Sequence, residues 1–207
     1  MSEPSARVTT RLSRAARRAE LTAAAREIFV AVGYHAAGMD DIAERAGVSK
    51  PVLYQHFPSK LELYTALLEE SAAEIVGMVR TAIASTDDND ERVKRAVEAY
   101  FTFVADNRQA YRLIFESDLR GQVEVERMVD RATEGCIDAI TDIITKDTGA
   151  DPERARLLAS GLVGLSQVSA RYWLARSEDV DRAEAVSLLS TLAWRGISRF
   201  PRISEGG

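Results

Sequence analysis

The residues from Lys50 to Phe57 combine side chains that suit nucleic-acid binding with a spacing that presents them on one short helix. Leu53 and Phe57 lie four residues apart, so both face inward if the segment is helical. The other faces then carry a cation, hydrogen-bonding groups and one small apolar group, namely Lys50, Tyr54, Gln55, His56 and Val52. Such a mixture is chemically suited to phosphates and to the edges of bases.

The residues just before this segment predict how it is held. Asp40 and Asp41 complement the dipole of a preceding helix in its first turn, and Gly47 ends that helix. Ser49 can cap the next helix through its hydroxyl, and Pro51 falls in the first turn, where its missing N–H costs no hydrogen bond. Two short helices joined by a glycine-containing turn predict a helix-turn-helix, which presents its second helix to the major groove of DNA.

Several segments in this part of the chain resemble the tetracycline-repressor (TetR) family of one-component bacterial transcription regulators. The resemblance covers about residues 12–68. It rests on Gly33-Tyr34, Asp41-Ile42-Ala43, Ala46-Gly47-Val48-Ser49, Leu53-Tyr54-Gln55-His56-Phe57 and Ser59-Lys60, which occur in this order near the N-terminus. Beyond these residues the chain is similar to the family only in length and helical layout.

The resemblance implies roles for individual residues. Base edges would be contacted by Lys50, Val52 and Gln55, and phosphates by Tyr54, His56 and Lys60. Ser49, Pro51, Arg14 and Arg17 complete the predicted DNA-binding set. The chain departs from the family at Ala37 and Gly38, where hydroxyl residues are usual, so a phosphate-binding hydroxyl is missing although Gly38 can still serve as an N-cap. Val52 stands where Thr or Gly is frequent and can contact only a thymine methyl.

Charge is distributed unevenly along the chain. The net charge is −5, yet residues 1–60 carry nine Lys or Arg and six Asp or Glu, which leaves +3 there and −8 in residues 61–207. Five arginines, Arg7, Arg11, Arg14, Arg17 and Arg18, form a basic arm placed to attract phosphate. The alternative is that this arm is only a solvated terminus.

Composition argues against catalysis and cofactors. The two histidines, His35 and His56, have no nucleophile or metal-binding partner nearby in sequence, and the chain has no glycine-rich phosphate loop and no metal-ligand spacing. Cys136 is the single cysteine, which fits a reducing compartment and a small buried apolar role. No apolar run is long enough to cross a bilayer and the start lacks a signal-peptide core, so we expect a soluble cytoplasmic protein without a membrane partner.

The periodicity of apolar residues predicts an all-α fold of about nine helices. We expect a three-helix DNA-binding domain over 1–60 and a helical effector-binding and dimerisation domain over 61–207. Beside the helix-turn-helix, helices are predicted over 13–32, 59–85, 91–105, 109–117, 122–145, 152–176 and 181–199. Ser59 and Glu62 have the spacing of a capping box, and Asp151-Pro152 that of a cap followed by proline.

The last two predicted helices carry small and branched residues on one face. The predicted dimer interface comprises Gly161, Gly164, Leu165, Val168, Leu189, Leu192 and Gly196. These residues alone are equally compatible with packing inside one chain. In TetR relatives the two helices pair with their copies, which favours a homodimer, and a two-fold symmetric protein matches a palindromic operator.

The larger half also contains aromatic and polar residues that suggest a cavity. The predicted ligand-binding set is Phe101, Val104, Tyr111, Phe115, Gln167, Arg171 and Tyr172. TetR relatives usually enclose an effector pocket here. Gln167 and Arg171, one helical turn apart, would hold the polar end of a small apolar or amphipathic effector. The alternative is that the aromatic side chains are simply core.

These features together predict a ligand-responsive transcription regulator, and specifically a repressor that leaves its operator when an effector binds. Two hypotheses of other classes stay open. One is an effector-independent DNA-organising protein that binds many sites, and the other is a small-molecule carrier with a vestigial DNA-binding domain.

Overall fold

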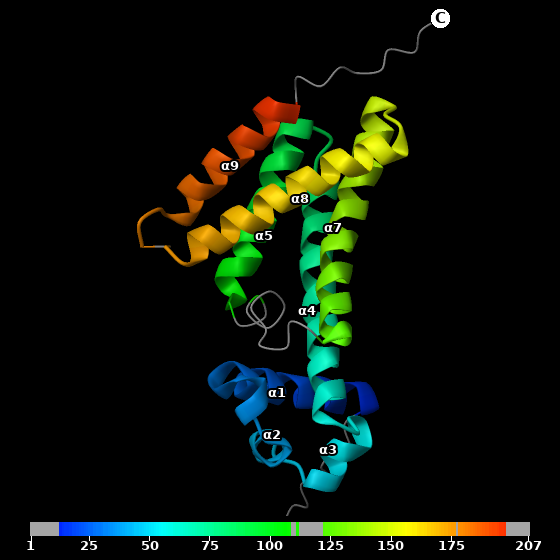
Figure 1. Cartoon of the computed structure of the whole chain (residues 1–207), viewed down its shortest axis with the longest axis vertical. Coiled ribbons are helices and arrows are strands. Elements are labelled where there is room, and N and C mark those ends of the chain that lie inside the picture. The colour runs from blue at the N-terminus through cyan, green and yellow to red at the C-terminus, as the bar shows by residue number, and fades with distance from the viewer. Residues whose placement is uncertain (1–12, 109–110, 112–121, 177, 198–207) are drawn as a thin grey trace, which may run out of the picture. The chain divides into compact units, whose positions relative to one another are not determined.

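A computed structural model describes residues 13–108, 111, 122–176 and 178–197, which form eight α-helices and contain no strand. The chain divides into two compact units, Met1–Leu67 and Leu68–Gly207, with the division inside one long helix (Figure 1). The predicted all-helical class is confirmed. The helix expected over 109–117 lies, apart from Tyr111, outside the described residues.

The smaller unit contains α1 (Arg14–Ala36), α2 (Met39–Arg45), α3 (Lys50–His56) and the start of α4 (Lys60–Ala84). Gly33 has a φ of 78°, which interrupts the helical backbone of α1 near the end that the sequence predicted. The core is formed by side chains from all four helices, Leu21, Ala25, Phe29, Ile42, Leu53, Phe57, Leu63 and Tyr64. Phe29 meets Tyr64 edge to face, with ring centroids 5.1 Å apart, which joins α1 to α4.

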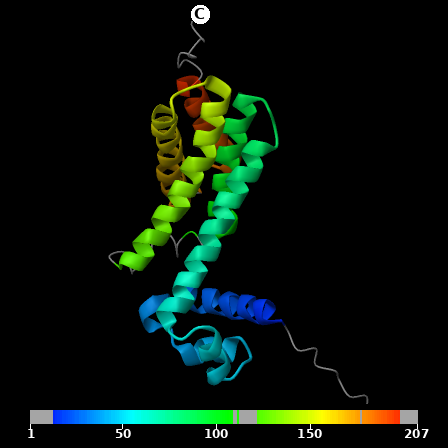
Figure 2. The same ribbon diagram turned by 90° about the vertical axis from the view of Figure 1, so that its right-hand side faces the viewer.

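The larger unit contains the remainder of α4, α5 (Asn89–Asp106), α7 (Val123–Thr148), α8 (Pro152–Leu174) and α9 (Arg182–Ile197). α8 packs along α7 and α5, and α9 packs against α5. In the side view of Figure 2, α7 lies between α8 and α4. The buried core around α7 comprises Val79, Cys136, Ile137, Ile144, Ala155, Ala159 and Val163.

Close approach of α4 and α7 explains one glycine in this unit. A Cβ added at Gly135 would lie only 2.8 Å from Val76 Cγ2, so the two helices meet where α7 has no side chain. Helix ends in this unit follow the sequence signals. Asp151 accepts from the amides of Glu153 and Arg154 at 3.1 and 3.3 Å, which confirms the predicted cap of α8.

Candidate nucleic-acid interface and effector pocket

The orientation of α3 separates its buried face from its exposed one. Leu53 and Phe57 are 0% and 1% exposed, as their spacing predicted. The exposed positions of the predicted set are Ser49, Lys50, Pro51, Tyr54 and Gln55, whereas Val52 and His56 are half-buried. The structure therefore brings the predicted cation, amide and phenol together on one accessible face of a short helix.

The start of α3 departs from the predicted cap in one respect. Ser49 occupies the N-cap position with extended backbone, and Pro51 lies in the first turn. However, the Ser49 side chain makes no capping hydrogen bond, so the expectation that its hydroxyl caps the helix is wrong. An exposed hydroxyl that is not used by the helix remains able to donate to a phosphate oxygen.

The end of α3 is held by Arg18, which the sequence had placed only in the basic arm. Its Nη1 donates to the carbonyl oxygen of His56 at 3.1 Å, and its guanidinium lies 4.1 Å from the centroid of the Phe57 ring. A cation at the last carbonyls of a helix complements the helix dipole. Arg18 thus fixes the C-terminal end of α3 from α1, a contact between residues 38 positions apart.

Lys50, at the start of α3, is paired with Asp40 of α2. Its Nζ lies 2.7 Å from Asp40 Oδ1 and 3.0 Å from Oδ2. The hydrogen bond to Asp40 raises the pKa of the Lys50 ammonium, so this group stays charged. Both side chains are exposed, so the pair is weak and a DNA contact at Lys50 competes with it.

Lys60 has a position that the family resemblance did not indicate. Its ammonium donates to the carbonyl oxygens of Tyr34, His35 and Ala37 at 2.8, 3.3 and 2.9 Å. It also lies 4.6 Å from the centre of the Tyr34 ring. A lysine has three N–H donors, and these bonds use all of them. The predicted phosphate contact therefore requires that Lys60 first release the end of α1.

The basic arm is described only in part, because residues 1–12 lie outside the described structure. Arg14 is exposed and has no ion pair or side-chain hydrogen bond with a described residue. Arg17 pairs with Glu20, with 2.7 Å between Nη1 and Oε2. Of the two, Arg14 has the guanidinium that is free for phosphate.

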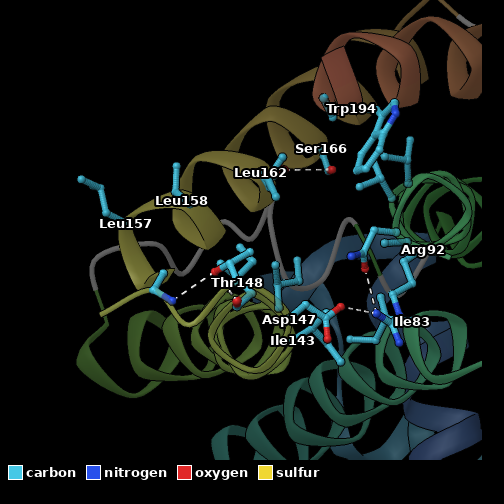
Figure 3. A pocket seen from close by; sticks show the side chains of 18 of the residues that line it. Ile83, Arg92, Ile143, Asp147, Thr148, Leu157, Leu158, Leu162, Ser166 and Trp194 are labelled. Atoms are coloured by element: carbon cyan, nitrogen blue, oxygen red, sulfur yellow. Dashed lines mark hydrogen bonds and ion pairs between the residues drawn. The ribbon is translucent and has the colours of Figure 1, made fainter. Parts of the chain in front are cut away.

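The larger unit contains a pocket of about 500 Å³ (Figure 3). Its apolar lining comes from all five helices of the unit and from the α7–α8 turn. These residues are Ile83, Val93, Ala96, Val97, Ile140, Ile143, Ile144, Ala150, Leu157, Leu158, Leu162 and Ala193. Its polar and indole side chains are Asn89, Arg92, Asp147, Thr148, Arg154, Ser166 and Trp194. An apolar cavity with a few polar groups has the character of a small-molecule site.

The ligand-binding residues predicted from the sequence lie elsewhere. Phe101, Val104 and Tyr111 are buried, Arg171 and Tyr172 are exposed, and Phe115 lies outside the described residues. Gln167 donates from its amide to the Thr133 hydroxyl at 2.9 Å. None of the described members of this set lines the pocket, so contact of the set with an effector stays a prediction.

Two residues of the predicted set, Gln167 and Arg171 of α8, lie near the buried hydroxyl of Tyr100 on α5. Desolvation raises the pKa of Tyr100 well above its usual range, and the proximity of Gln167 and Arg171 opposes that shift.

The predicted dimer face is at the surface of α8 and α9. Val168 and Leu192 are 59% and 60% exposed, and Leu165 and Leu189 are half-buried. A Cβ added at any of Gly161, Gly164 and Gly196 would meet no atom within 4 Å, so these glycines leave open space in the single chain. Three further exposed apolar side chains of these helices are Leu157, Tyr172 and Leu188.

Each of the two units matches a family of known proteins. Residues 21–67 match a family model described as "Bacterial regulatory proteins, tetR family", and residues 89–196 match one described as "Tetracyclin repressor-like, C-terminal domain". The "HTH-type transcriptional activator FasR" of Mycolicibacterium smegmatis is 51% identical over 191 residues, which cover 92% of this chain and 87% of that protein.

Solved structures give the same fold. A TetR-like transcriptional regulator from Rhodococcus sp. RHA1 has a TM-score of 0.70 and 28% identity, covering 91% of this chain and all of that one. The transcriptional regulator FadR from Bacillus subtilis, solved in complex with stearoyl-CoA, has a TM-score of 0.69 and 18% identity, covering 84% of this chain and 95% of that one. No helix among the described residues is long and apolar enough to span a membrane.

Proposed function

The chain belongs to the TetR family of bacterial transcription regulators, and we propose that it binds a palindromic operator as a homodimer and responds to a small-molecule effector. The observation that carries the DNA-binding part is the exposed face of α3. Lys50, Tyr54 and Gln55 are accessible there because Leu53 and Phe57 anchor the opposite face. Gln55 offers a bidentate contact to adenine and Lys50 a donor to guanine.

The small size of this surface supports the proposed homodimer. A recognition helix of seven residues contacts few base pairs, and a second copy doubles the site. The exposed apolar face of α8 and α9 supports the same proposal, since its three glycines allow the backbone of a second copy to approach closely.

The effector proposal rests on the pocket. Its volume lies within the range of small-molecule sites, and most of its lining is aliphatic. The complex of B. subtilis FadR with stearoyl-CoA supports an effector with a long hydrocarbon chain. Ligand binding would shift α4 and with it the distance between the two recognition helices. Operator half-sites are fixed about one DNA turn apart, so a shift of a few ångströms releases the DNA.

The sign of regulation has two candidates. A protein that leaves its operator when the effector binds acts as a repressor if the operator overlaps the promoter. Activation is the second candidate, because the 51% identical M. smegmatis relative FasR is a transcriptional activator. In transcription with purified polymerase, a repressor lowers the run-off product from an operator-containing promoter, whereas an activator raises it.

Selection of bound sequences from random DNA, followed by footprinting, tests the central proposal. We expect one palindromic motif and protection of few sites. Protection of many unrelated sites would instead support a DNA-organising protein, and no binding at any salt concentration would support a carrier.

A series of fatty carboxylates of increasing length tests the effector proposal. Each CH₂ buried in the pocket contributes about 0.8 kcal/mol, or roughly a fourfold gain in affinity, until the pocket is filled. Affinity that does not change with chain length would contradict an aliphatic effector.

A further inference from the structure

The pocket's polar side chains fall into two groups, those that are satisfied within the protein and those that are not. Asn89 begins α5 and Arg154 lies in the first turn of α8, while Asp147 and Thr148 end α7. Trp194 lies near the end of α9. These polar residues all line the pocket and lie near the starts or ends of their helices. Figure 3 shows Asp147, Thr148 and Trp194 together with the aliphatic side chains of the lining.

The side chains of the first group form hydrogen bonds and ion pairs within the protein. Arg92 is only 8% exposed, and its guanidinium donates to the carbonyl of Thr86, to Asn89 Oδ1, and to the carboxylates of Asp147 and Asp87. A buried arginine that donates to this many acceptors has little capacity left for a ligand. Arg92 and Asp147 thus form part of the pocket wall and add no unpaired charge to it.

The hydroxyls of this wall are also engaged. Thr148 Oγ1 donates to the carbonyl of Ile144 at 2.6 Å and accepts from the amide of Ala150 at 3.2 Å. Ser166 Oγ donates to the carbonyl of Leu162 at 3.0 Å. The O–H groups of both residues therefore donate to carbonyl oxygens within their own helices.

The second group consists of donors. Arg154 has no ion pair or side-chain hydrogen bond with any described residue, and the same holds for the indole N–H of Trp194. Asn89 uses its amide oxygen to accept from Arg92, which leaves its NH₂ group. A guanidinium, an indole N–H and an amide NH₂ donate hydrogen bonds and do not accept them, so each requires an acceptor on the ligand. The unused polar capacity of these lining residues is thus mainly that of donors, one of which is the positively charged guanidinium of Arg154.

We propose that the pocket binds an aliphatic chain ending in an anionic oxygen group, and that Arg154, with Trp194 and Asn89, holds that group at the pocket rim. This inference rests on the proposed effector function and adds the polarity of the ligand and the residues that recognise it. A carboxylate and a phosphate share the chemistry that these donors recognise. The anchor differs from the Gln167 and Arg171 pair expected from the sequence.

The test is calorimetric titration of the full-length protein with four ten-carbon ligands: decanoate, decyl phosphate, decan-1-ol and decyltrimethylammonium. We expect the two anions to bind at least tenfold more tightly than the alcohol and the cation to bind weakest. The anion that binds more tightly shows whether a carboxylate or a phosphate fits the site better. Equal binding of the alcohol and the anions would overturn the inference while leaving an effector pocket in place.

Variants assign the effect to Arg154. Arg154→Gln should weaken decanoate binding about tenfold and leave decan-1-ol binding unchanged, because only the charge-assisted hydrogen bonds are lost. Arg154→Lys should restore part of the loss. Arg156→Gln is the matched control, since Arg156 lies on the same helix but pairs with Glu134 and Asp138 of α7. An equal loss for both ligands in Arg154→Gln, or the same loss in Arg156→Gln, would overturn the assignment.

Operator binding by the same preparations separates the two proposals. If the proteins bind operator DNA but none of the four ligands, both the head-group inference and the effector proposal fail and the DNA-binding proposal stands. Thermal unfolding of Arg154→Gln should match that of the unsubstituted protein, because the Arg154 side chain makes no ion pair or hydrogen bond with the described residues that the substitution would break.

Discussion

Replacing Lys60 by methionine distinguishes a clamp inside the DNA-binding unit from a contact with DNA. The ammonium donates to three carbonyl oxygens at the end of α1, and methionine keeps the length of the side chain but none of the donors. Buried hydrogen bonds to a charged group contribute roughly 1.5–3 kcal/mol each, and partial exposure reduces this. We therefore expect Lys60→Met to destabilise the smaller unit by about 2 kcal/mol.

The salt dependence of operator binding provides the decisive measurement. Each phosphate contact contributes roughly 0.9 to the slope of log affinity against log salt concentration. Because all three donors of Lys60 are used within the protein, Lys60→Met should weaken binding to every sequence but leave the slope unchanged. Arg14→Gln is the positive control, since Arg14 is exposed and has no ion pair with a described residue, and it should lower the slope by about 0.9 per protomer.

Thermal unfolding and a conservative variant complete the test. Lys60→Arg keeps the charge, but its planar fork cannot place three donors as an ammonium does, so stability should be restored only in part. The reasoning would be refuted if Lys60→Met lowered the salt slope as much as Arg14→Gln and left the unfolding temperature unchanged.

Three further predictions concern other parts of the chain. Gln55→Ala should cost about 1–3 kcal/mol of binding free energy on the selected operator and relax the base preference at one base pair per half-site, whereas Tyr54→Phe should weaken binding to all sequences alike. A shift of base preference in site selection with Tyr54→Phe, and none with Gln55→Ala, would show that the roles of the two residues are the reverse. Gly164→Leu should sediment as a monomer, and since a Cβ there meets no atom of its own chain, an unchanged dimer would place the interface elsewhere. The Cys136 thiol, whose pKa burial raises to about 11, should react with iodoacetamide at pH 8 only after denaturation, and rapid alkylation of the folded protein would contradict its burial.

The smaller unit was predictable because its signals are local. Gly47 adopts a positive φ just after α2, where the sequence predicted a helix end, and Gly33 does so three residues before the last residue of α1. Leu53 and Phe57 are buried as their spacing indicated. What the sequence did not indicate are contacts between distant residues. Arg18 donates to the carbonyl of His56, 38 positions away, and Lys60 donates to the carbonyl of Tyr34, 26 positions away. The sequence predicted phosphate contacts for Arg18 and Lys60 because it does not show that their side chains bind within the protein.

The larger unit was predictable as helices but not as a pocket. Apolar periodicity placed the helices within a few residues of α5, α7, α8 and α9. It could not tell which large side chains fill the core and which line a void, because both are apolar. Phe101 packs against Trp173, with ring centroids 5.4 Å apart, while the cavity is bounded mainly by aliphatic side chains from several helices. Only the three-dimensional arrangement of these helices reveals where packing is incomplete.

We expect a ligand bound in this pocket to control operator binding, and a titration of operator DNA measures that control. Fluorescence anisotropy of labelled operator DNA would be measured with and without a saturating concentration of whichever ten-carbon amphiphile binds most tightly. A ligand releases DNA only through its different affinity for the two conformations, and a tenfold effect corresponds to about 1.4 kcal/mol of coupling. We predict at least a tenfold loss of operator affinity with ligand bound. Identical operator affinity at ligand saturation would contradict the account.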